Sequence, residues 1–127
     1  MVDDDAGSDV IALRPFVPAT NFDTSLRFYT DLGFEPFRLG DAMASMGLGA
    51  FSFLLHQYDQ KEFANHFVMH LLVKDVGPWW SRIAALDLAG RYGVQAPSAP
   101  KLQPWGLVVA YVFDPSGVLW HFAESQP

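Results

Sequence analysis

The chain has 127 residues, a formal net charge of −6 and no cysteine. Disulfide and thiolate chemistry are therefore excluded, and the negative charge disfavours nucleic acid because it repels phosphate groups. Half of the residues are hydrophobic and 15% are aromatic, so one packed domain is expected at this length. The sequence shows neither a run of about 20 apolar residues that would span a bilayer nor a signal-peptide pattern. A cytoplasmic protein without a membrane partner is the expectation.

The first half of the chain alternates strand and helix signals. Residues 10–18 are apolar and β-branched, which predicts a strand. Asn21 is a typical N-cap residue, and apolar side chains at helical spacing predict a helix over 22–32 that ends at Gly33. Glycines then separate three predicted strands, at 34–38, 43–48 and 50–57.

The second half repeats this order. Residues 58–65 form a charged connector, and the apolar segment 67–74 predicts a strand. Asp75 is the predicted N-cap of a second helix. Residues 95–104 contain three prolines and are expected to form a long loop. The predicted closing hairpin comprises strands 108–113 and 118–123, joined by the turn at 114–117.

One pattern therefore occurs twice, as two βαβββ units at about 9–57 and 66–124. We predict an α+β fold in a single domain over 9–125, preceded by a disordered polar tail at 1–8. The helices of such a fold pack on one face of each curved sheet. The opposite faces then enclose a cleft, where a small-molecule ligand is expected to bind.

Three segments carry a family resemblance: NFDTSLRFYTDLGF at 21–34, VKDV at 73–76 and DPSGVLWHF at 114–122. Over about residues 10–124 the chain resembles the vicinal oxygen chelate superfamily, which includes glyoxalase I, extradiol dioxygenases and bleomycin resistance proteins. The QPWG segment at 103–106 is most similar to the bleomycin-resistance branch. That resemblance implies a homodimer whose two clefts lie across the subunit interface, and drug binding without a metal, a cofactor or chemistry.

The resemblance also identifies where the superfamily's enzymes carry metal ligands. These positions fall on Arg14, Phe53, Val68 and His121 in this sequence. A guanidinium has no lone pair to donate, and the Phe and Val side chains are inert, so His121 alone can ligate a metal. Catalytic zinc needs about three protein ligands. We therefore predict no metal site and no catalytic residue.

A rearranged metal site is the main alternative. His66, His70 and His121 are its candidate ligands, with His56 or Glu124 nearby, and they would support a metal-dependent lyase or dioxygenase. Against it, two residues four apart on a strand are about 13 Å apart, so His66 and His70 do not readily share one ion. His121 alone could also act as a general base or be a satisfied core histidine. A regulatory module with an unused cleft is a third hypothesis.

Trp105 is the strongest candidate for ligand contact, because a loop indole offers a rigid face for stacking. The alternative is that Trp105 packs against a partner subunit. Arg14 either binds an anionic group in the cleft or lies on the surface. The predicted function is sequestration of a partly aromatic ligand. The predicted ligand-binding residues are Arg14, Phe53, Val68, His70, Trp105 and His121.

Overall fold

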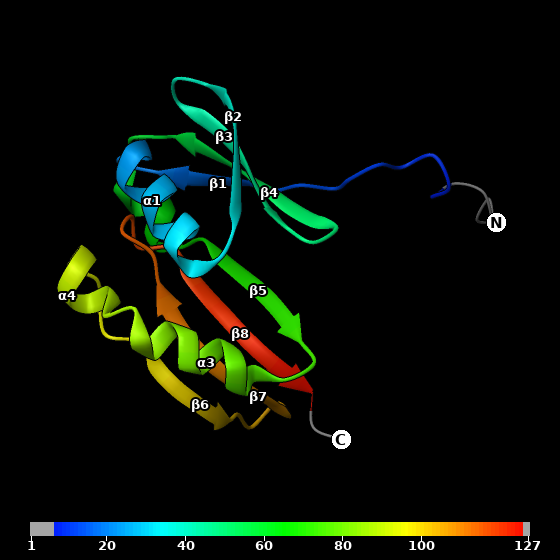
Figure 1. Cartoon of the computed structure of the whole chain (residues 1–127), viewed down its shortest axis with the longest axis vertical. Coiled ribbons are helices and arrows are strands. Elements are labelled where there is room, and N and C mark those ends of the chain that lie inside the picture. The colour runs from blue at the N-terminus through cyan, green and yellow to red at the C-terminus, as the bar shows by residue number, and fades with distance from the viewer. Residues whose placement is uncertain (1–6, 126–127) are drawn as a thin grey trace.

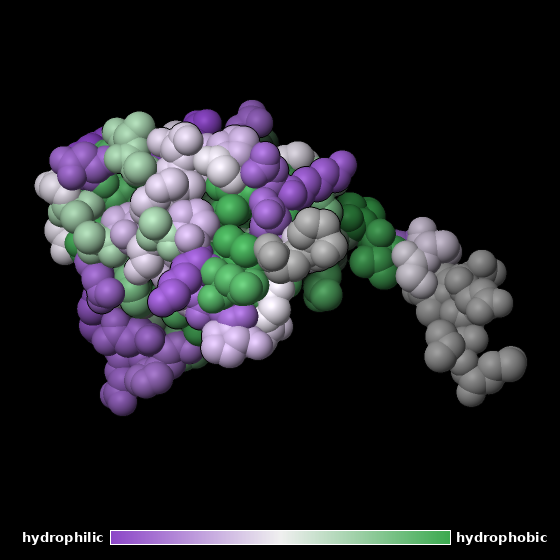
Figure 2. Space-filling model, turned by 90° about the horizontal axis from the view of Figure 1, so that it is seen from below, coloured by the Kyte–Doolittle hydropathy of each residue, from purple (hydrophilic) through white to green (hydrophobic). Residues whose placement is uncertain are grey.

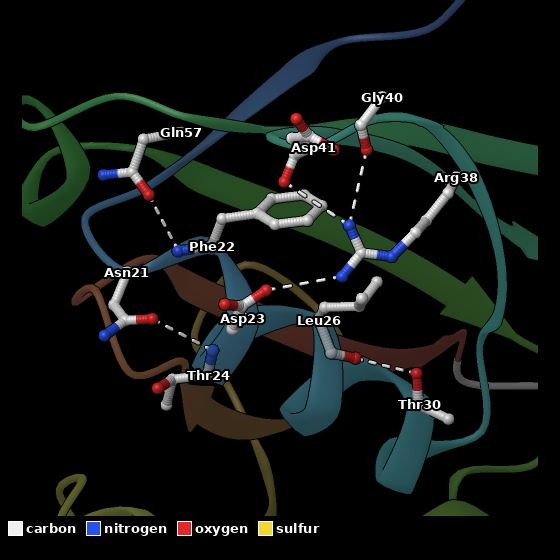
Figure 3. Close-up of polar contacts among 10 residues, drawn as sticks. All are labelled: Asn21, Phe22, Asp23, Thr24, Leu26, Thr30, Arg38, Gly40, Asp41 and Gln57. Atoms are coloured by element: carbon white, nitrogen blue, oxygen red, sulfur yellow. Dashed lines mark hydrogen bonds and ion pairs between the residues drawn. The ribbon is translucent and has the colours of Figure 1, made fainter.

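The first helix, α1 (Phe22–Leu32), begins and ends where local sequence signals place it. The side chain of Asn21 accepts a hydrogen bond from the backbone N–H of Thr24 at 3.2 Å, as Figure 3 shows. Gly33 ends the helix with φ of 121°, in the region that favours glycine. The predicted helix over 22–32 is therefore confirmed at both ends.

The computed structural model describes residues 7–125, which form two four-stranded sheets with helices packed on them (Figure 1). The first sheet has the order β1-β4-β3-β2 and comprises β1 (Phe16–Ala19), β2 (Glu35–Gly40), β3 (Met43–Leu48) and β4 (Phe51–Gln57). The second has the order β5-β8-β7-β6 and comprises β5 (Val68–Val73), β6 (Ser98–Leu102), β7 (Leu107–Phe113) and β8 (Leu119–Ser125). The remaining helices are α2 (Lys61–Asn65), α3 (Val76–Ala85) and α4 (Leu88–Tyr92).

Both sheets are built by the same connections. The first strand of each unit pairs parallel with the last, and the other neighbours pair antiparallel. Helix α1 contacts the first sheet and α3 contacts the second. The predicted α+β fold of two βαβββ units is confirmed. Within residues 7–125, no helix is both long and apolar enough to cross a membrane.

The strand predicted over 10–18 is mostly wrong. Only Phe16–Ala19 pairs with β4, and the preceding residues run away from the body as an extended segment (Figure 1). A strand needs a neighbour for its backbone groups, and among the described residues no strand pairs with 10–14. Of the predicted disordered tail at 1–8, residues 1–6 lie outside the described part of the chain.

Two segments predicted as irregular contain regular structure. The predicted loop at 95–104 includes β6, which pairs with β7 at the edge of the second sheet. Proline is tolerated at a sheet edge, so Pro100 does not prevent this pairing. The predicted connector at 58–65 includes α2, a helix of five residues that is too short to show a clear apolar period.

The two units are joined through a buried hydrogen-bonded group. The Tyr29 hydroxyl on α1 donates to the Asp114 carboxylate at 2.6 Å and accepts from the Trp120 indole at 2.8 Å. None of the three side chains is more than 2% exposed. Burial raises the pKa of Asp114, and the hydrogen bonds from Tyr29 and from the turn's backbone partly oppose this rise. Because the Tyr29 hydroxyl bonds to both other members, its removal leaves Asp114 Oδ2 and the Trp120 N–H without these partners.

We predict that Tyr29→Phe lowers the free energy of unfolding by roughly 2–4 kcal/mol, because it leaves one oxygen of a buried carboxylate and a buried indole N–H without a hydrogen-bond partner. Urea denaturation followed by circular dichroism measures the change. The control is Tyr58→Phe, at a residue that is 42% exposed. Equal stability of the two variants would contradict the role given to this group.

Candidate ligand-binding groove

The candidate site lies on the face of the second sheet that α3 does not cover. Along β8, Trp120 and Phe122 are buried in the core, and the alternate residue His121 points to the opposite face. The parallel pairing of β5 with β8 places His70 directly beside His121. Two histidines that are 51 positions apart in the sequence are therefore neighbours on this open face.

An aromatic group surrounds this pair. The Nδ1 atoms of His70 and His121 are 3.2 Å apart and share a hydrogen bond. The Trp105 ring centroid lies 6.4 Å from that of His70 and 5.9 Å from that of His121. Tyr111, on β7, meets His121 edge-on at 5.1 Å between centroids. We call His70, Trp105, Tyr111 and His121 the aromatic cluster.

The chain turns sharply to present Trp105. The backbone N–H of Gly106 donates to the carbonyl of Gln103 at 2.9 Å, and Gly106 has φ of 98°. Glycine is needed here because other residues rarely adopt this conformation. The indole remains 53% exposed, so its face is available to a ligand or to a partner.

A groove of about 550 Å³ runs along β6 next to the aromatic cluster. Tyr111 belongs to both, so the groove and the cluster adjoin at this residue. The groove is lined by Ser98, Ala99, Lys101, Leu102, Gln103, Pro104, Val109 and Tyr111. Its size is within the range of small-molecule sites, and its apolar and aromatic character suits a planar ligand.

The structure brings together three of the six predicted ligand-binding residues: His70, Trp105 and His121. The other three are placed differently. Arg14 lies on the exposed N-terminal segment, where its guanidinium donates to the Ser52 hydroxyl at 2.9 Å. Phe53 is only 2% exposed and packs on Tyr29 and Trp120 in the core.

Val68 is 51% exposed and sits two residues before His70 on the same strand face. A smaller cavity of about 180 Å³ links Phe53 to His70. Phe53 is therefore connected to the aromatic cluster, although it is not part of it.

The residues at the superfamily's metal positions do not fit a metal. Arg14, Phe53 and Val68 offer no donor atom. Within residues 7–125, no three His, Cys, Asp or Glu side chains converge. The Nδ1 atom of His66 instead contacts the carbonyl oxygen of Glu62, at 2.8 Å. The alternative of a site built from His66, His70 and His121 therefore lacks a common centre.

The sequence did not lead us to predict that Tyr111 and Lys101 line the groove. Both reach the groove because β6 and β7 pair, and the sequence of 95–104 gave no clear strand signal. The alternation of residues along 108–113 was the available signal for Tyr111, since it places this residue on the same face as Val109. Lys101 had no comparable signal.

A superfamily profile provides the family assignment. The profile described as Glyoxalase/Bleomycin resistance protein/Dioxygenase superfamily matches residues 10–122. The chain belongs to this superfamily. A comparison with curated protein sequences finds no match.

Solved structures show the same fold. A bleomycin-binding protein complexed with bleomycin is 22% identical, with a TM-score of 0.78 over 92% of this chain and 100% of the other. The bleomycin-binding protein of bleomycin-producing Streptomyces verticillus, complexed with copper(II)-bleomycin, is 20% identical, with a TM-score of 0.78 over 93% and 98%. Lactoylglutathione lyase from Agrobacterium tumefaciens is 18% identical, with a TM-score of 0.66 over 91% and 93%. At these identities the likeness establishes the fold, which binders and enzymes share.

Burial lowers the pKa of His121, and the nearby charge of His70 lowers it further. A histidine whose pKa is lower in the folded state contributes fully to stability above its unfolded pKa. That contribution is lost as the pH falls through the folded value. Protonation of His121 therefore works against the folded aromatic cluster in mildly acidic solution.

We predict that His121 titrates below 6.5, the usual value for histidine. In His70→Gln the pKa of His121 should rise, because the neighbouring charge is removed, yet it should stay below 6.5 because the ring remains partly buried. Imidazole NMR resonances followed against pH measure both values. His66→Gln should leave the titration unchanged, and an unaltered curve in His70→Gln would contradict the coupling.

Proposed function

We propose that the chain is a small-molecule binding protein of the bleomycin-resistance type, which sequesters a partly aromatic ligand without a resident metal and without chemistry. The observation that carries this proposal is the aromatic cluster, in which an exposed indole stands beside a groove of about 550 Å³. Stacking on Trp105 supplies a flat apolar contact. His70 and His121 supply polar contacts that orient the ligand.

The charge of the groove narrows the ligand class. Lys101 brings a positive charge to the lining, and no Asp or Glu accompanies it among the lining residues that the structure describes. A positive lining attracts anionic groups and repels cationic ones. The groove therefore fits a planar ligand with a neutral or acidic group near Lys101 better than one that places a cation there.

The proposed ligand site is completed by a second copy of the chain. Ile11 and Leu13 are 96% and 93% exposed on the N-terminal segment, and Figure 2 shows hydrophobic surface there. Val68 and Leu72, on the open face of the second sheet, are 51% and 55% exposed. Apolar surface of this extent favours association. A symmetric dimer buries both regions at once, because each copy supplies both.

We predict that Leu13→Asp weakens self-association, because it places a charge in the apolar contact. Sedimentation velocity over a dilution series should show a dimer for the wild type and a shift toward monomer for the variant. Phe63→Asp, at a residue of α2 that is 48% exposed, is the matched control and should remain dimeric. A wild-type protein that stays monomeric at the highest concentration would contradict the dimer.

We predict that Trp105→Ala weakens binding of metal-free bleomycin, or of a neutral planar probe, by roughly 3- to 10-fold, the usual worth of an aromatic stacking pair. Isothermal titration calorimetry with a chelator present measures the affinity. Phe63→Ala is the control for loss of an exposed aromatic ring. If Trp105→Ala binds every probe as tightly as the wild type, the proposed stacking role is wrong.

A further inference from the structure

The two histidines of the aromatic cluster face each other through the same ring atom. His70 and His121 are register partners on the parallel strands β5 and β8, and their Nδ1 atoms are 3.2 Å apart. One Nδ1 must donate and the other accept, so a single proton lies between the two nitrogens. That arrangement is also the starting geometry for two nitrogen ligands of one metal ion.

The separation of the two nitrogens fits a metal ion in place of the proton. Imidazole nitrogens bind zinc at 2.0–2.1 Å, so two of them on a tetrahedral ion lie about 3.3 Å apart. Cis ligands of a square-planar ion lie slightly closer, at about 2.9 Å. The observed 3.2 Å falls between these values. The ring centroids are 5.4 Å apart, so the two nitrogens meet nearly head-on, and both rings must rotate for their lone pairs to converge on one ion.

We propose that His70 and His121 form a two-nitrogen site for a late first-row divalent metal ion, with copper(II) bound most tightly. Imidazole suits copper, nickel and zinc, and among these ions copper(II) has the highest affinity for a given set of nitrogen ligands. His70 is exposed and His121 is partly buried, so an ion can enter from the groove. The site shares His121 with the superfamily's metal positions, but its second ligand, His70, is not one of them, and Arg14, Phe53 and Val68 take no part in it.

Only two protein ligands are available, so the protein fills only two coordination positions of the bound ion. Among residues 7–125 no third His, Cys, Asp or Glu converges on the pair. His56, which is the remaining histidine besides His66, stacks on Tyr58 in the first sheet. The bound ion therefore keeps open coordination positions toward the groove, for water or for donor atoms of a small chelating molecule. Such an ion exchanges readily and is not a resident cofactor, which is consistent with the proposed function.

The test uses the metal alone, on tag-free full-length protein treated with a chelator and then dialysed. Calorimetric titration with copper(II) should give one ion per chain, with zinc binding more weakly. Loss of a hydrogen-bond partner to a metal ligand already costs about 10- to 100-fold in affinity, so His70→Gln and His121→Gln should each cost at least tenfold. Electron paramagnetic resonance should detect two imidazole nitrogens on copper in the wild type.

His56→Gln and His66→Gln are the matched controls and should leave copper binding at this site unchanged. Circular dichroism confirms that each variant is folded. The proposal is overturned if the double variant His70→Gln/His121→Gln binds copper as tightly as the wild type, or if the wild-type spectrum shows fewer than two imidazole nitrogens. Neither titration contains an aromatic ligand, so failure here is separate from failure of the sequestration proposal.

Discussion

The buried hydrogen bond between Tyr29 and Asp114 positions the two halves of the protein relative to each other. Tyr29 comes from α1 in the first unit, and Asp114 begins the turn between β7 and β8 in the second. The same carboxylate accepts from the backbone N–H groups of Ser116 and Val118 at 2.8 and 2.9 Å, and so it also shapes this turn. The register in which β8 enters its sheet depends on that turn.

The register of β8 then determines the site. Because neighbouring residues of a strand point to opposite faces, Trp120 enters the core and closes the hydrogen-bonded group while His121 faces the groove. A shift by one residue would exchange the two and remove both the core indole and the imidazole of the candidate site. The core and the candidate site are therefore specified by the same strand. The open face that results is partly apolar, and this is the physical reason for expecting a second copy to cover it.

Local signals made part of this structure predictable. The helix over 22–32 followed from its cap, its apolar period and Gly33, all of which act within one or two turns. The pairing of His70 with His121 and the approach of Tyr111 depend on strand register, which a single sequence does not specify. β6 was missed because a proline such as Pro100 is tolerated in a strand mainly at a sheet edge, and edge position is a tertiary property. The superfamily's ligand positions pointed to Phe53 and Arg14, but burial places the first in the core and the second lies on the exposed segment.

Native mass spectrometry of the tag-free protein, mixed with metal-free bleomycin or a planar acidic probe in the presence of a chelator, would show whether the protein binds its ligand without a metal and without chemistry. We expect a dimer that carries up to two ligand molecules and no metal ion, with the ligand recovered chemically unchanged. Ligand binding that requires a tightly held metal ion, or conversion of the ligand into a product, would contradict it.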